Sequence, residues 1–180
     1  MTAAAMLAEL GKKVLVLEQH YVPGGFTHAF KRGHYEWDVG VHAIGEVGEQ
    51  ALLGRLLTQL TDGALKWASL GSVYDEFYYP DLRIDFPDNA TDFRANLVAA
   101  FPNDVEAIDA YLDRVKRVGR GMKGYLQSRA MPPNWFGRMA GSRMSRDAAE
   151  GFNKTAAEVL DEVTDNDKLK KVLTGQWGYH

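Results

Sequence analysis

Four consecutive apolar residues, Val14 to Leu17, follow two lysines and stop at the carboxylate of Glu18. A run that is apolar at every position is typical of a short parallel strand buried on both faces of a sheet. The residues before it, from Thr2 to Leu10, have the pattern of the end of a helix, and Gly11 stands where a left-handed residue closes such a helix. The order of helix, glycine and buried strand predicts the middle of a βαβ unit.

A βαβ unit binds its ligand at the carboxyl end of its strands. In dinucleotide-binding folds an acidic residue at the end of the second strand accepts hydrogen bonds from a ribose diol, and Glu18 has this position. Pro23-Gly24-Gly25 follows, and two glycines let the backbone pass close to a diphosphate; a simple Pro-Gly turn is the alternative. The glycine-rich turn that precedes the helix in such folds is not in the sequence, so we expect the chain to begin after it.

The composition is that of a globular protein. Of its 180 residues, 46% are hydrophobic and 25% are charged, and the formal net charge is -3, which argues against disorder and against a general attraction to nucleic acid. The absence of cysteine excludes disulfides, cysteine-based zinc sites and thiol catalysis. No apolar stretch approaches the roughly 20 residues that span a bilayer, and the N-terminus has no signal-peptide pattern. We therefore expect a cytoplasmic or peripheral membrane location.

The patterns divide the chain into two predicted domains, residues 1–47 and 48–180. The second opens with a leucine-rich helix from Leu52 to Leu60 and continues with a β-hairpin at about 74–86. From about 91 to 180 the sequence is helical in pattern.

Two pairs of residues in this helical part predict helix starts. Asn103 with Glu106, and Thr155 with Glu158, have the spacing of capping boxes. The glycines between positions 119 and 124 are expected to interrupt any long helix between these starts.

Three motifs follow one another in the first quarter of the chain. They are Ala3-Ala4-Ala5-Met6-Leu7-Ala8 with Val14-Leu15-Val16-Leu17-Glu18-Gln19, then Pro23-Gly24-Gly25, then Asp38-Val39-Gly40-Val41-His42. Together they resemble the FAD-binding N-terminal region of the phytoene desaturase, carotenoid isomerase and all-trans-retinol 13,14-reductase (retinol saturase) group of flavoproteins. The likeness is strongest to the retinol reductase branch, which Leu173-Thr174-Gly175-Gln176-Trp177-Gly178 also resembles.

The resemblance implies a fold and a cofactor. The fold is α/β: a partial Rossmann-like FAD-binding domain whose first strand is missing, with an α+β, largely helical substrate-domain insertion. The cofactor is FAD, with NAD(P)H as a possible electron donor in the full-length enzyme. The cofactor-binding residues that it implies are Glu18 and Gln19 at the adenosine, Gly24, Gly25 and Thr27 at the diphosphate, and Gly40, Val41 and His42 at the flavin ring. No residue is nominated as a catalytic acid or base.

One departure from the group concerns the diphosphate. Many relatives place an arginine directly after the two glycines, whereas this chain has Phe26. Thr27 can donate a hydroxyl hydrogen bond to the diphosphate, but it carries no positive charge. Either Lys31 or Arg32 supplies that charge, or both are simply solvent-exposed residues of a loop.

The basic residues are concentrated in one stretch. Between Arg114 and Arg146 there are nine lysines and arginines and no acid, interleaved with Trp135, Phe136 and several methionines. This mixture suits a peripheral membrane segment that touches anionic lipid headgroups; a solvated basic face with inward-packed aromatics is the alternative. Nucleic-acid binding is not expected, because no recognisable module surrounds the stretch.

The histidines give no metal site. His20, His28, His34 and His42 are separated by eight, six and eight residues, which matches neither a helical pair of ligands nor a zinc finger. We expect no metal.

Three functions remain open. The first is a fragment of an FAD-dependent oxidoreductase that acts on carbon–carbon double bonds of a lipophilic isoprenoid, a retinoid or carotenoid, by saturation, desaturation or isomerisation. The second is a non-catalytic truncated or pseudoenzyme module that serves as a scaffold or binds a lipid surface. The third replaces FAD with NAD or S-adenosylmethionine, because an acid at the end of the second strand also binds their ribose.

Overall fold

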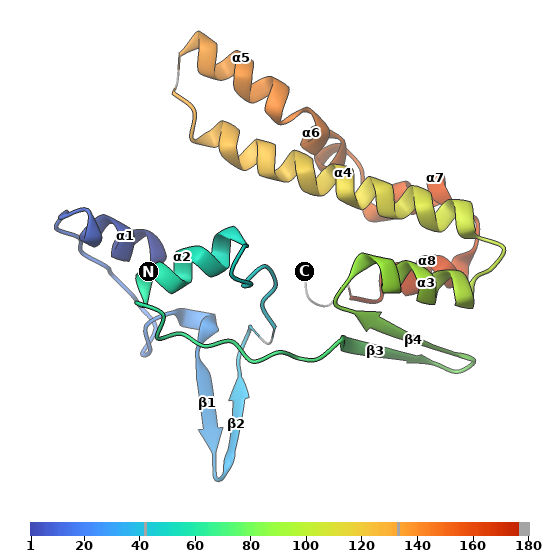
Figure 1. The fold of residues 1–180 in the computed structure, drawn as a ribbon, viewed down its shortest axis with the longest axis horizontal. Coiled ribbons are helices and arrows are strands. Elements are labelled where there is room, and N and C mark those ends of the chain that lie inside the picture. Colours follow the sequence, from blue (N-terminus) through green and yellow to red (C-terminus); the bar gives the residue numbers. More distant parts are fainter. Residues whose placement is uncertain (42, 133, 177–180) are drawn as a thin grey trace. The chain divides into compact units, whose positions relative to one another are not determined.

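The computed structural model describes residues 1–41, 43–132 and 134–176 and shows a helix-rich α/β chain with two small antiparallel sheets (Figure 1). The chain forms two compact units, Met1–Ser69 and Leu70–His180. Each unit is described by itself below.

The first unit contains short elements. They are α1 (Thr2–Glu9), the 3-10 turn η1 (Gly25–Thr27), β1 (Ala29–Arg32), β2 (Tyr35–Asp38) and α2 (Leu52–Leu60). The predicted first helix is confirmed as α1, and Gly11, with φ of 74°, is the left-handed residue behind it. The predicted leucine-rich helix is confirmed as α2. The β1–β2 hairpin was not predicted; the stacked rings of Phe30 and Trp37, with centroids 5.4 Å apart, lie on it.

The buried strand predicted over residues 14–17 is wrong for this structure. The four residues lie in no strand and are exposed, Leu15 by 81% and Leu17 by 86%. A buried strand needs neighbours that satisfy its amides and carbonyls, and no strand among the described residues pairs with this run. The apolar side chains therefore remain in solvent.

The second unit contains one hairpin and six helices within its described part. These are β3 (Val73–Tyr79), β4 (Leu82–Pro87), α3 (Ala90–Ala100), α4 (Val105–Arg129), α5 (Trp135–Met144), α6 (Arg146–Asn153), α7 (Ala156–Val163) and α8 (Asp167–Leu173). The predicted hairpin and helical region are confirmed. Because Tyr79 pairs with Leu82, the turn consists of Pro80 and Asp81.

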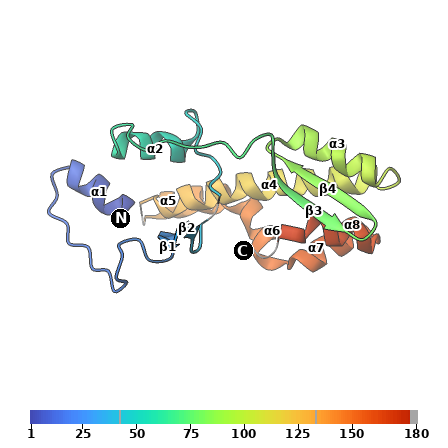
Figure 2. The same cartoon turned by 90° about the horizontal axis from the view of Figure 1, so that it is seen from below.

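The second unit has a well-packed core. Figure 1 shows the hairpin, then α3 with α8, then α4 with α7 as successive layers, and in Figure 2 α3 and α8 flank the hairpin. The buried side chains that join these layers are Ile84, Phe86, Leu97, Phe101, Ile108, Leu169 and Val172. The alternating burial along β3 and β4 puts one face of the hairpin against this core.

The helix starts agree with the sequence in one case and not in the other. Thr155 and Glu158 form the predicted capping box of α7. The box predicted at Asn103 with Glu106 is wrong, since Asp104 is the N-cap of α4 and makes no side-chain cap bond. Its carboxylate instead accepts hydrogen bonds from Thr164 and Asn166, 3.3 and 2.8 Å away, which tie α4 to the turn before α8.

The glycines at 119–124 do not interrupt α4, contrary to expectation. The helix runs for 25 residues through all of them. Gly124 has a packing reason: a Cβ there would lie 2.1 Å from the carbonyl oxygen of Met144, so the glycine lets α4 and α5 approach closely. None of the described helices has the length and apolar character of a bilayer-spanning segment.

Candidate functional site

Glu18 and the glycine turn lie together in the first unit. The backbone amide of His20 donates to Glu18 Oε1 over 2.9 Å, and the amides of Gly24 and Gln19 also act on this carboxylate. The hydrogen bond from His20, with smaller contributions from the other two amides, lowers the pKa of Glu18. The carboxylate is exposed and ionised at neutral pH, and it stays an acceptor for further hydrogen bonds.

The two glycines of the turn both have left-handed backbones. Gly24 has φ of 107° and Gly25 has φ of 55°, conformations that side chains with a Cβ rarely adopt. A Cβ on Gly25 would meet no atom within 4 Å, so the backbone there is open to a ligand. The hydroxyl of Thr27 donates to the carbonyl oxygen of Gly24 over 2.8 Å, so in this structure it holds the turn and does not point its hydrogen outward.

Gly40 lies against the same turn. A Cβ at this position would lie 2.9 Å from the carbonyl oxygen of Phe26, and the amide of Val39 donates to the carbonyl of His28 over 3.1 Å. The structure thus brings Gly40 next to residues 24–27. Val41 follows, exposed and outside any helix or strand, and His42 lies outside the described residues.

An aromatic cluster beside the turn was missed by sequence reasoning. The rings of His20 and His28 lie 4.6 Å apart, and the hydroxyl of Tyr21 lies 3.2 Å from His28 Nε2. His28 Nδ1 lies 2.6 Å from the carbonyl oxygen of Gly25, which fixes the cluster on the turn. His20 and His28 lie in a loop, where no helix or strand periodicity relates two residues eight positions apart. Their contact is therefore seen only in the folded structure. Within the described residues, no three acidic or histidine side chains gather as metal ligands.

The chain is similar in sequence to several known proteins. Residues 1–60 match the model of the NAD(P)-binding Rossmann-like domain family. The all-trans-retinol 13,14-reductase of Danio rerio is 32% identical over 97% of this chain, and a second protein of that fish, named inactive all-trans-retinol 13,14-reductase, is 30% identical over 97%. The chain is related to the all-trans-retinol 13,14-reductases. A prolycopene isomerase from an Oncidium hybrid cultivar is a more distant relative, 28% identical over 77% of the chain.

This chain covers only part of the length of its relatives. The chain spans about 30% of the length of both zebrafish proteins and 24% of the isomerase. No solved structure matches the chain. The family resemblance predicted from the three motifs is confirmed, and the Rossmann-like match covers all of them.

Proposed function

We propose that this chain works in an FAD-dependent oxidoreductase that acts on carbon–carbon double bonds of a lipophilic isoprenoid, a retinoid or a carotenoid. The observation that carries the proposal is the similarity over 97% of the chain to a protein named all-trans-retinol 13,14-reductase. The Rossmann-like match over 1–60 and the pairing of Glu18 with a glycine turn support a dinucleotide such as FAD.

The residues of the first unit fit the adenosine half of FAD. The exposed carboxylate of Glu18 would accept hydrogen bonds from the ribose hydroxyls, with Gln19 beside the adenosine. The open backbone at Gly25, together with Gly24, would lie along the diphosphate. In this assignment, residues 1–47 are a partial FAD-binding Rossmann-like domain.

The remaining assignments complete the proposed site. Gly40, Val41 and His42 would lie under the flavin ring, and Thr27 would keep the turn in shape through its bond to Gly24. FAD supplies the hydride or electron chemistry, with NAD(P)H as donor, while the chain binds the cofactor and shields it. Residues 48–180 would form the start of a substrate or lid domain.

Peripheral membrane contact is the second part of the proposal. The far end of the α4–α5 pair carries large exposed apolar side chains, Trp135 by 71% and Phe136 by 64%. Leu126, Met131 and Met139 are also exposed on these two helices and the turn between them, where Arg129 and Arg138 are exposed as well. Exposed apolar side chains interleaved with cations suit the surface of an anionic membrane, from which a lipophilic substrate enters.

A non-catalytic module is the alternative. The specific observation in its favour is the 30% identity to a relative that is named inactive. In this alternative the chain serves as a scaffold or binds a lipid surface through the same end of α4 and α5.

Flavin binding tests the role assigned to Glu18. FMN lacks the adenosine that Glu18 would hold, so the protein should bind FAD about tenfold tighter than FMN in a fluorescence titration. Glu18→Ala should remove this preference, while Glu49→Ala, a change to another exposed carboxylate of the first unit, should preserve it. An unchanged FAD-to-FMN ratio in Glu18→Ala would refute the assigned role of Glu18.

Product analysis completes the test. The protein is incubated with FAD, a reductant and all-trans-retinol, and saturated retinoid is measured by chromatography. Product would support the enzyme. Bound FAD without product is what a cofactor-binding fragment of a longer enzyme would give, whereas no bound FAD at all would favour the non-catalytic module.

Membrane contact has its own test. Sedimentation with phosphatidylcholine vesicles should increase when phosphatidylserine is included and fall with added salt. The double change Trp135→Ala with Phe136→Ala should reduce it several-fold, whereas Trp67→Ala in the first unit should not. Equal sedimentation with neutral and anionic vesicles would count against the assigned surface.

A further inference from the structure

A hollow of about 810 Å³ lies in the second unit where α5 passes into α6. Both helices pack against α4, and Figure 1 shows them following each other along it. The polar residues that line this α5–α6 hollow are Ser142, Arg143, Ser145 and Arg146. The hydroxyl of Ser145 donates to the carbonyl oxygen of Gly141 over 2.8 Å, which holds the turn on which the two arginines stand.

The two arginines of the hollow carry unpaired charges. Neither the guanidinium of Arg143 nor that of Arg146 forms an ion pair or a hydrogen bond with any residue that the structure describes. A guanidinium has five N–H donors in a fixed fork, and the exposed hydroxyl of Ser142 adds one more. An anion with several oxygens therefore fits the hollow.

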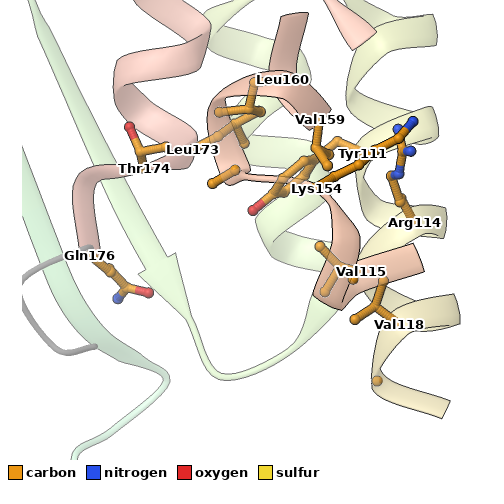
Figure 3. A pocket seen from close by; sticks show the side chains of 13 residues that line it. Tyr111, Arg114, Val115, Val118, Lys154, Val159, Leu160, Leu173, Thr174 and Gln176 are labelled. Atoms are coloured by element: carbon orange, nitrogen blue, oxygen red, sulfur yellow. The ribbon is translucent and has the colours of Figure 1, made fainter. Parts of the chain in front are cut away.

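The apolar cavity of the same unit differs in this respect. It has a volume of about 630 Å³ between α4 and α7, and Figure 3 shows Arg114 and Lys154 among its lining side chains. Both cations contact the carboxylate of Glu162: Arg114 Nη1 lies 2.8 Å from Oε2 and Lys154 Nζ lies 2.5 Å from Oε1. The chain itself supplies an anion there, whereas none of the described carboxylates does so in the α5–α6 hollow.

The side chains next to the hollow indicate where its anion comes from. Phe136, Met139 and Arg143 follow one another at intervals of three and four residues, so they lie on one face of α5. At 1.5 Å per residue, Arg143 lies about 10 Å along the helix from Phe136. Exposed apolar side chains that suit a membrane thus stand beside two unpaired cations. The oxygens nearest to such a face are those of the lipid phosphates.

We propose that the α5–α6 hollow binds the phosphomonoester headgroup of an anionic lipid such as phosphatidic acid, with Arg143 and Arg146 on the phosphate oxygens. A phosphomonoester offers three terminal oxygens and a charge of about −1.5 to −2 at neutral pH. The phosphodiester of phosphatidylserine offers fewer oxygens and carries an ammonium, which the arginines repel. The inference rests on the membrane contact proposed above and adds to it the choice of lipid.

The test compares phosphatidylcholine vesicles that contain phosphatidic acid with vesicles that contain phosphatidylserine, prepared at equal zeta potential. The full chain should sediment with the first about tenfold more tightly than with the second. Arg143→Gln with Arg146→Gln should lower this ratio to about one. Lys116→Gln with Arg120→Gln removes the same number of charges from α4, outside the hollow, and should preserve the ratio. Circular dichroism confirms that both variants are folded.

A soluble phosphomonoester separates a lipid from a free phosphate as the ligand. Glycerol 3-phosphate should bind about a hundredfold more weakly than phosphatidic acid, because it lacks the acyl chains. Equal affinity for the two would overturn the lipid assignment. Vesicle binding with a ratio near one, or a ratio that survives the change of both arginines, would overturn the phosphate site while leaving the membrane contact intact. Binding to neither kind of vesicle would refute the membrane contact itself, and the lipid site with it.

Discussion

At the start of α7, Thr155 and Glu158 satisfy each other's backbone amides. The amide of Glu158 donates to Thr155 Oγ1 over 3.2 Å, and the amide of Thr155 donates to Glu158 Oε2 over 2.7 Å. Thr155→Ala should lower the free energy of unfolding by about 1 kcal/mol, measured by urea titration. Thr91→Ala, a change to an exposed threonine inside α3, should be neutral or slightly stabilising because alanine favours helix. Equal losses in the two variants would contradict the assigned cap.

The same pair predicts a pH dependence. Hydrogen bonds from Thr155 lower the pKa of Glu158 from its ordinary value of 4.5. A carboxylate whose pKa is lower in the folded state stabilises the fold above its unfolded pKa, and this contribution is lost as the pH falls through the folded pKa. The stability difference between the unmodified protein and Glu158→Gln should therefore be constant near neutral pH and shrink below about pH 4.5. A difference that grows on acidification would contradict the bond.

Between elements, the approach of α4 to α5 depends on a glycine. Gly124→Ala would place a Cβ against the Met144 carbonyl and should cost about 1 to 3 kcal/mol of unfolding free energy. Gly119 lies in the same helix, where a Cβ meets nothing within 4 Å, so Gly119→Ala should instead stabilise by about 0.5 to 1 kcal/mol. Urea titrations of the two variants measure both changes in unfolding free energy. Stabilisation by both changes would show that α4 and α5 do not pack this closely.

The elements show what the sequence can and cannot predict. Helix α1 with Gly11, the hairpin at Tyr79 and Leu82, and the Thr155 cap follow from local signals that act within a few residues. Gly124 was misread because its reason is a contact with α5, 20 positions along the chain. The carboxylate of Asp104, likewise, bonds to residues near α8 and caps no amide of its own helix. Neither of these two contacts between distant segments could be predicted from a local sequence pattern.

In the candidate site, too, local signals were readable from the sequence and contacts between separate segments were not. Glu18 and Gly24 were singled out by residue type and position, and the structure shows the amide of Gly24 acting on the Glu18 carboxylate, while their cofactor roles stay predictions. The tilted contact between the rings of His20 and His28 was not predictable from their spacing. The run at 14–17 has the composition of a buried strand, yet burial requires partner strands, and composition alone does not supply them.

For the molecule as a whole, that exposed run predicts self-association. Adjacent apolar side chains with unpaired backbone groups are a template for pairing with another chain. Sedimentation velocity at rising protein concentration should show oligomers, which Leu15→Lys with Leu17→Lys should suppress. Leu10→Lys with Leu52→Lys replaces two exposed leucines outside the run and should have a smaller effect. A monomer at every concentration, or equal suppression by both pairs, would contradict the role of the run.

The two units should also differ in stability. Every buried apolar side chain of the described core lies at Ile84 or later, and α1 and α2 have only 8 and 9 residues, below the about 12 that an isolated helix needs. Hydrogen exchange should therefore be slow around Leu97, Ile108 and Leu169 and fast through residues 1–69. If the first unit binds FAD, protection should appear around Gly24 and Gly25 when FAD is added, with the second unit unchanged. Slow exchange of α1 without FAD would mean that the first unit has a source of stability other than its own buried side chains.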